Sequence, residues 1–175
     1  MDMSKLLERH QHVILATDII ALGGRATTIE SIVGIPKRAA SKLHRDIANR
    51  SSKGGLLPWD PHWVVKTPMN CLHSSFFYRI YHDIEIRMPR KTEKKTLFLA
   101  AFRLYRNTIE DHVIDIDRAW HIHLQYSSGN YVFKHCLRCR SNHLAHKNYP
   151  PVFQLCPLCD VNIDVINRKR WAQRP

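Results

Sequence analysis

The sequence predicts a mainly α-helical protein, and two patterns carry that prediction. Apolar residues recur at helical spacing through a body spanning residues 1–130, which contains a helix-turn-helix-like element. Residues 131–175 instead carry two Cys-x-x-Cys pairs among many basic residues, as in a zinc-ribbon-like module with four cysteine ligands. We therefore expect a helical domain over 1–130 and a zinc-binding basic C-terminal module over 131–175. A chain of 175 residues, 44% of them hydrophobic, can form one compact domain or two small lobes.

The first expected helix covers the stretch SKLLERHQHVILATDIIALGG. Its apolar residues follow a period close to 3.6, and Ser4 can cap its start. Gly23 and Gly24 can end it, because glycine readily adopts the left-handed conformation that terminates a helix.

A helix-turn-helix pattern follows in TTIESIVGIPKRAASKLHRDI. Thr27 or Thr28 can cap a short helix through Val33, Gly34 turns the chain, and Pro36 opens a second helix to about residue 48. The outward face of the second helix carries cations and a hydroxyl that could contact DNA: Lys37, Arg38, Ser41, Lys42 and Arg45. The pattern is equally typical of an ordinary two-helix corner with a solvated basic face. A protein–protein role for this face is also allowed.

The remaining body is expected to be helical after a connector. SSKGGLLPWDPHWVVKTP is rich in Gly, Pro and Ser and predicts an ordered connector. Residues 70–87 should form a helix, and 96–107 and 115–129 two more, with Asp115 or Asp117 as a cap and Gly129 as a stop. The apolar stripe of the 70–87 helix is expected to be Leu72, Phe76, Ile80 and Ile84, flanked by Phe77 and Tyr81.

The charge balance points to a polyanionic partner. Lys and Arg number 27 against 15 Asp and Glu, a net charge of +12. A small protein with this excess usually meets nucleic acid. No run of about 18 apolar residues could span a membrane, so the sequence favours a cytoplasmic protein whose thiols stay reduced.

The strongest chemical signal is the pair of motifs formed by Cys136, Cys139, Cys156 and Cys159. Two cysteines separated by two residues bring both thiolates to one side of a tight turn. Two such pairs, here separated by sixteen residues, complete the tetrahedron that Zn²⁺ prefers. The sequence therefore predicts one structural Zn²⁺. An odd total of five cysteines makes disulfides the weaker explanation.

Other chemistries fit the cysteines less well. A thioredoxin-like redox pair needs a βαβ context, which the pattern does not supply. Zinc deaminases need His-x-Glu and Pro-Cys-x-x-Cys, but no glutamate here lies two residues after a histidine and Leu155 stands in place of the proline. Four thiolates also leave no open coordination position for water, so the sequence predicts no enzyme. A variant ligand set that uses His135, His143 or His146 is the poorer alternative.

Basic residues crowd the zinc module. From residue 134 to the end there are eight Lys and Arg against Asp160 and Asp164, and eight minus two gives +6. Such a rim suits phosphate contact, although a solvated basic tail would look the same. The candidate DNA-binding residues here are Lys134, Arg138, Arg140, Lys147, Arg168, Lys169 and Arg170.

With these motifs the chain resembles the FlhC family, whose members are a subunit of the flagellar master transcriptional regulator. The resemblance lies in LATDIIALGGR and the turn-helix element after it, in KGGLLPWDPHWV, and in RAW followed by Ser128–Gly129 and the first cysteine pair. It maps the family's zinc ligands onto the four paired cysteines. It also implies a DNA-binding subunit that works with a small helical FlhD-like partner in a hetero-oligomer and recruits RNA polymerase to promoter DNA.

The regulon stays open in this interpretation. The resembling family includes activators of flagellar genes and of conjugative transfer in mobile elements. The loop RSNHLAHKNYPPVFQL and the short basic end differ from the flagellar type. The alternative function is a zinc-stapled protein–protein interaction module without direct DNA contact.

Overall fold

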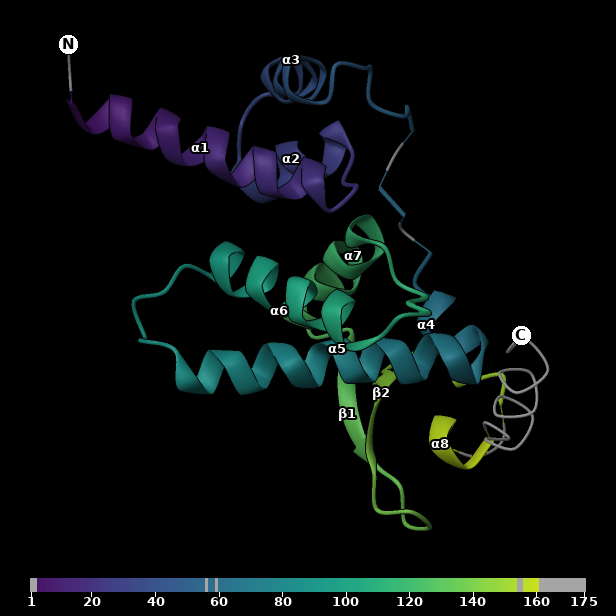
Figure 1. Ribbon diagram of the computed structural model, residues 1–175. Helices are drawn as coiled ribbons and strands as arrows, with labels where there is room; N and C mark the ends of the chain where they lie inside the picture. Colours follow the sequence, from purple (N-terminus) through teal and green to yellow (C-terminus); the bar gives the residue numbers. More distant parts are fainter. Residues whose placement is uncertain (1–2, 56, 59, 154–155, 161–175) are drawn as a thin grey trace, which may run out of the picture. The chain divides into compact units, whose positions relative to one another are not determined.

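A computed structural model describes residues 3–55, 57–58, 60–153 and 156–160 of the chain. The chain divides into two compact units. Figure 1 labels the helices and strands that compose them. Unit 1 comprises Met1–Trp59 and Phe77–Leu124, and unit 2 comprises Asp60–Phe76 and Gln125–Pro175. The protein is mainly helical with a cysteine cluster near its end, as the sequence predicts. Unit 2 joins residues 60–76 to the C-terminal part of the chain. The domain division expected at residue 130 stays a prediction.

Three helices begin unit 1: α1 (Met3–Ala21), α2 (Ala26–Val33) and α3 (Lys37–Ala48). The expected glycine stop of α1 is confirmed, since Gly23 has φ +86° and its N–H donates to the carbonyl of Ile20. Gly24 must lack a side chain, because a Cβ there would lie 2.4 Å from the Ile19 side chain. Gly34 adopts φ +79° and ends α2, and Pro36 occupies the N-cap position of α3 without a capping side-chain bond.

The start of α2 differs from the sequence prediction. Neither Thr27 nor Thr28 caps it, because both lie inside the helix and Arg25 occupies the N-cap position. The backbone N–H of Arg25 donates instead to the Asp117 carboxylate, 3.1 Å away, and the N–H of Ala26 donates to the Ser52 hydroxyl, 2.9 Å away. Residues distant in sequence satisfy these orphan donors, so local spacing could not identify the cap.

The rest of unit 1 packs around aromatic rings. The segment of α5 (Pro68–Arg87) from residue 77 onward, α6 (Lys94–Thr108) and the unit 1 part of α7 (Ile116–Ser127) supply them. Phe77 lies edge-on to Phe98, with ring centroids 5.9 Å apart, and Phe98 meets Trp120 at 4.9 Å. Asp115 caps α7 by accepting the N–H of Arg118 at 2.7 Å, which confirms one of the two expected caps.

The expected stripe on α5 is largely wrong. Ile80 is buried, but Phe76 is 36% exposed and Leu72 and Ile84 are half-buried. Phe77 and Tyr81, the expected flanking residues, are buried. The other buried side chains of α5 are Cys71, His73, Ser74, Ser75 and Tyr78. The large rings of α5 pack in unit 1, and its small side chains pack against a strand in unit 2. The pattern of apolar residues alone does not predict this change of partner along the helix.

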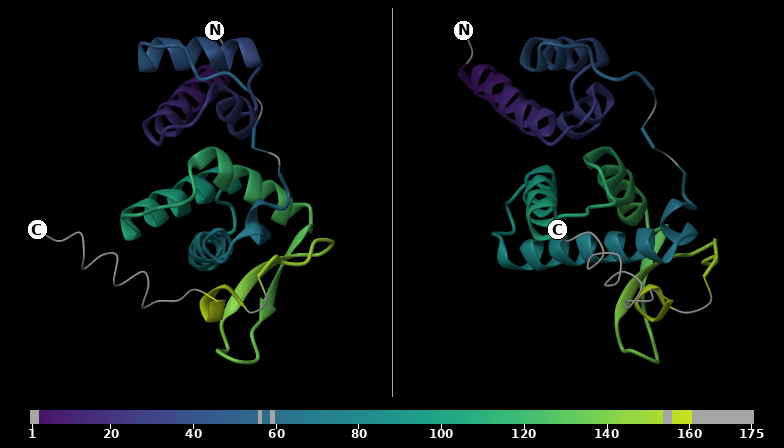
Figure 2. Two further views of the ribbon diagram at one scale, coloured as in Figure 1. Left: turned by 90° about the vertical axis from the view of Figure 1, so that its right-hand side faces the viewer. Right: turned by 45° about the vertical axis from the view of Figure 1, so that its right-hand side comes forward.

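Unit 2 contains the only strands among the described residues, and the sequence interpretation missed them. β1 (Tyr131–His135) pairs antiparallel with β2 (Asn142–His146), in a register that sets Phe133 opposite Leu144. The short helices α4 (Trp63–Lys66) and α8 (Pro157–Asp160) complete the unit (Figure 2).

The N-terminal part of α5 is bound to strand β2 within unit 2. The Ser75 hydroxyl accepts the N–H of Leu144 at 2.9 Å, and the Cys71 thiol donates to the Leu144 carbonyl at 3.1 Å. Tyr131 donates its hydroxyl to the carbonyl of Pro61, 2.9 Å away. Within the described ranges, no helix is both long and apolar enough to cross a membrane.

Candidate metal centre and cationic surfaces

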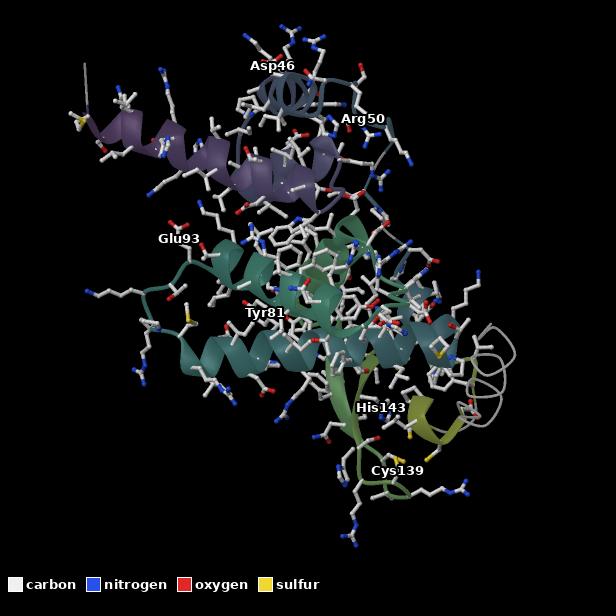
Figure 3. The ribbon with its side chains drawn as sticks, in the orientation of Figure 1. Asp46, Arg50, Tyr81, Glu93, Cys139 and His143 are labelled. Atoms are coloured by element: carbon white, nitrogen blue, oxygen red, sulfur yellow. The ribbon has the colours of Figure 1, made fainter. Side chains whose placement is uncertain are left out.

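The four paired cysteines gather at one end of the β1–β2 hairpin. Figure 3 shows Cys139 at the tip of the hairpin loop. The Sγ atoms of Cys139 and Cys156 lie 3.3 Å apart, and those of Cys136 and Cys159 lie 4.0 Å apart. All four sulfur atoms lie within 4.8 Å of one another.

Backbone hydrogen bonds form the two turns that hold the thiols. In the first turn, the N–H of Arg140 donates to the Cys136 carbonyl at 2.8 Å, and the N–H of Cys136 donates to the Ser141 carbonyl at 2.9 Å. Arg140 adopts φ +58° to close this turn. In the second, the N–H of Cys159 donates to the Cys156 carbonyl at 3.0 Å as α8 begins. Each Cys-x-x-Cys pair thus points its sulfur atoms to one side, as the sequence predicts.

The sulfur geometry fits a tetrahedral ion. Zn–S bonds of about 2.3 Å place the corners of a tetrahedron about 3.8 Å apart. The distances of 3.3 and 4.0 Å lie on either side of that value. Four cysteines at these separations could bind a metal ion, and the all-sulfur donor set is that of structural zinc.

Neighbouring groups shift the pKa values of the thiols in opposite directions. Hydrogen bonds from the Ser141 hydroxyl and backbone lower the pKa of Cys139 to about 6. The Cys159 thiol is hydrogen-bonded to its neighbour Cys156, which raises the pKa of Cys159 to about 12. Thiols this close cannot all ionise alone, whereas a divalent ion would deprotonate them together.

The alternative histidine ligands lie outside the cluster. The group that could hold a metal in the described part of the chain consists of the four cysteines. His135 instead meets the Asn142 side chain at 3.0 Å, and His146 accepts the N–H of Asn148 at 3.1 Å. His143 lies on β2, away from the hairpin tip in Figure 3.

The fifth cysteine is a core residue. Cys71 is fully buried, and burial raises the pKa of its thiol to about 12. Two histidines of α7 are also core residues. His121 and His123 are both buried on α7, and His123 stacks on Trp120 with ring centroids 5.2 Å apart.

The zinc module presents its candidate cations to solvent. Lys134, Arg138, Arg140 and Lys147 are all exposed, around the hairpin that carries the cysteines. Arg168, Lys169 and Arg170 lie outside the described residues.

The second set of candidate cations lies on α3 in unit 1. All five predicted residues are exposed, while Ala40 and His44 are buried on the other side. They line a hollow of about 590 Å³ together with two serines that the sequence interpretation missed. The lining residues are Lys37, Arg38, Ser41, Lys42, Arg45, Ser51 and Ser52. The only signal for the serines was their place just after the helix.

Comparison with known proteins identifies the family. The model of the family "Flagellar transcriptional activator (FlhC)" matches residues 1–172. A flagellar transcriptional regulator FlhC from Variovorax paradoxus is 28% identical over 163 residues, which cover 91% of this chain and 79% of that protein. The protein of the same name from Gallionella capsiferriformans is 26% identical, with 91% and 88% covered. That from Proteus mirabilis is 23% identical, with 100% and 92% covered.

This family consists of transcriptional regulators and not of enzymes, in agreement with the closed four-thiol centre. The match over nearly the whole chain, together with the helical body and the cysteine cluster, shows that the protein belongs to the FlhC family of flagellar transcriptional activators.

Proposed function

We propose that this chain is the DNA-binding subunit of a hetero-oligomeric transcriptional activator. It acts with a small helical FlhD-like partner and RNA polymerase at promoters of flagellar or conjugative-transfer genes. The observation that carries the proposal is the family match over residues 1–172. The two exposed cationic surfaces, one on α3 and one on the zinc module, support it because Lys and Arg displace counterions from DNA.

The zinc module has a defined part in this proposal. Cys136, Cys139, Cys156 and Cys159 would hold Zn²⁺. The ion would supply no catalysis, since four thiolates fill its coordination, but it would fix the hairpin that carries Arg138 and Arg140. Cations on a rigid support contact phosphates at a smaller entropic cost.

The DNA-binding proposal is tested with the chain co-purified with the FlhD-like protein of the same genome. Promoter duplexes from flagellar and from transfer operons are titrated by fluorescence anisotropy across a salt series. We expect binding whose affinity falls steeply with salt. Truncation before Arg168 removes four cations, including Arg174, and should weaken binding. A complex that ignores both duplexes favours the alternative, a zinc-stapled interaction module.

An exposed row of apolar residues on α1 supports the proposal that a helical partner binds this chain. Met3 is 67% exposed and Leu7 is 58% exposed, and the large apolar residues of the row are Met3, Leu6, Leu7, Val13 and Ile14. At 100° per residue this row faces opposite to Ala16 and Ile19, the buried residues of the same helix. Figure 1 shows the N-terminal half of α1 extending past α2 and α3.

A helix with an exposed apolar row is stabilised when another surface covers that row. Residues 3–15 include no buried side chain, and isolated helices of about that length are marginal in water. A second amphipathic helix would cover the row. A second copy of the chain fits less well, because two chains of net charge +12 repel each other.

The partner surface is tested by a double substitution, Leu7→Gln with Ile14→Gln. We expect it to abolish co-purification with the FlhD-like protein, because it breaks the apolar row. The matched control, Lys5→Gln with His12→Gln, changes the opposite side of α1 and should leave co-purification intact. Equal recovery of partner with both variants would remove α1 from the interface.

A further inference from the structure

The hollow beside α3 differs from an ordinary solvated helix face in its shape. Five of its lining residues come from α3, and the other two are serines of the following loop. Its volume of about 590 Å³ falls within the range of about 300–1,000 Å³ that ligand sites occupy.

The wall of the hollow is fixed by the fold of unit 1. Asn49 ends α3 in the left-handed conformation, with φ +52°, and turns the chain back. The ring Nδ1 of His44 then meets the Arg50 carbonyl at 3.3 Å. Ser52 accepts the N–H of Ala26 at 2.9 Å, which ties the loop to the start of α2. These anchors lie on both sides of Ser51 and fix the loop that carries the two serines.

The lining chemistry selects the ligand. Four of the lining side chains are cations and the other three are hydroxyls, with no carboxylate or amide side chain among them. Asp46, the acidic residue of α3, does not line the hollow. Phosphate oxygens accept hydrogen bonds from such donors, and so do O6 and N7 of guanine, so the lining chemistry selects a ligand rich in acceptors.

The concave shape of the hollow also favours a phosphate ligand. A helix that reads base edges must project its side chains into the major groove. Here the cations border a concavity whose other lining residues are serines, and a concavity lined by donors can receive a phosphodiester strand.

From this geometry we infer that the hollow formed by α3 and Ser51–Ser52 is a phosphate-binding site that holds backbone phosphates of the promoter duplex. This inference rests on the proposed function and refines it. The α3 surface supplies affinity and registers the protein on the duplex, and it does not select the sequence.

Phosphate binding itself is tested without DNA. Inorganic pyrophosphate is titrated calorimetrically into three forms of the partner complex: wild type, Lys42→Gln with Arg45→Gln, and the control Arg90→Gln with Lys91→Gln. The control removes the same charge from exposed positions between α5 and α6. We expect binding by wild type and control, and its loss in the hollow variant. No binding by wild type, or equal binding by both variants, overturns the inference.

The source of the phosphate is tested with a promoter duplex and a scrambled duplex across a salt series. The hollow variant should bind both at least about tenfold more weakly, with a salt slope smaller by about two, while their affinity ratio stays within about twofold. A collapse of that ratio would mean base reading and would overturn the inference. A nucleoside triphosphate that binds far more tightly than pyrophosphate would overturn the backbone assignment.

The two proposals fail separately. A hollow variant that binds the promoter as tightly as the wild-type complex refutes the phosphate site and leaves DNA binding by other surfaces in place. A wild-type complex that binds no duplex refutes the proposed function itself. Unchanged thermal unfolding of the variant excludes misfolding as the cause of any loss.

Discussion

Unit 1 and unit 2 bury different kinds of interior. In the described residues, the largest fully buried side chains all belong to unit 1 except Tyr131 and Leu144. Unit 1 buries a cluster of phenylalanine and tyrosine rings with isoleucines from several helices. Unit 2 buries small or polar side chains such as Ser74, Ser75 and His146 around a two-stranded hairpin.

The difference teaches how each unit is stabilised. Ring packing and apolar burial can hold unit 1 without any ion. A small unit with few large buried side chains usually needs a metal or other cross-link to fold. The four cysteines lie in unit 2 and supply that site.

The largest expected effect comes from preventing metal binding, which should unfold one unit and not the other. Cys156→Ser should abolish zinc retention and unfold unit 2 while the helical signal of unit 1 persists, because metal binding in small zinc modules contributes about 10–16 kcal/mol. Elemental analysis and residue-resolved hydrogen exchange measure both outcomes. Cys71→Ser is the control, since this buried thiol lies outside the cluster. A Cys156→Ser protein with normal metal content would contradict the comparison.

The next effect should fall on unit 1. Asp117 is buried and accepts hydrogen bonds from Arg25 and from the Thr28 hydroxyl. Asp117→Ala would leave the half-buried Arg25 guanidinium without its carboxylate partner. This should lower the free energy of unfolding by about 3–5 kcal/mol. Asp83→Ala, which breaks the exposed pair with Arg79, should cost less than about 1 kcal/mol. Chemical denaturation compares the two, and equal effects would show that burial does not matter here.

A pH effect should also localise to unit 1. Burial, and then the charge of Lys94, lower the pKa of His123 from 6.5 to about 4. Between those values the unfolded chain binds a proton that the folded unit excludes. Stability is therefore lost as the pH falls from 6.5 to about 4, by on the order of 3 kcal/mol. Denaturation curves of His123→Phe should show a flatter profile in this window, and a profile as steep as the wild type would assign the loss elsewhere.

The smallest expected effect concerns the cap between α2 and the loop. Ser52→Ala removes the acceptor of the Ala26 N–H and should cost about 1 kcal/mol. Ser51→Ala, its neighbour on the wall of the hollow, should leave the unfolding free energy unchanged within about 0.5 kcal/mol. Parallel urea titrations measure both. Equal losses would show that Ser52 does not cap α2 specifically.

Much of the helical body could be predicted because its signals are local. Gly23 and Gly34 end their helices where the sequence places the stops, and the cations of α3 are exposed as the helical period requires. The α5 stripe could not be predicted, because the Ser75 hydroxyl accepts a hydrogen bond from Leu144, a tertiary contact with a residue 69 positions away. The strands were missed because the cysteine spacing, and not a strand pattern, dominates residues 131–146.

The sequence by itself determined which four cysteines come together as a group that could bind a metal ion, since two Cys-x-x-Cys turns need only local backbone geometry to aim their sulfur atoms. It also determined the charge and the helical stops. Only the tertiary structure decided which distant carboxylate and hydroxyl cap α2, and which serines enclose the cations of α3. These contacts join residues as many as 92 positions apart, and no periodic pattern along the chain encodes them.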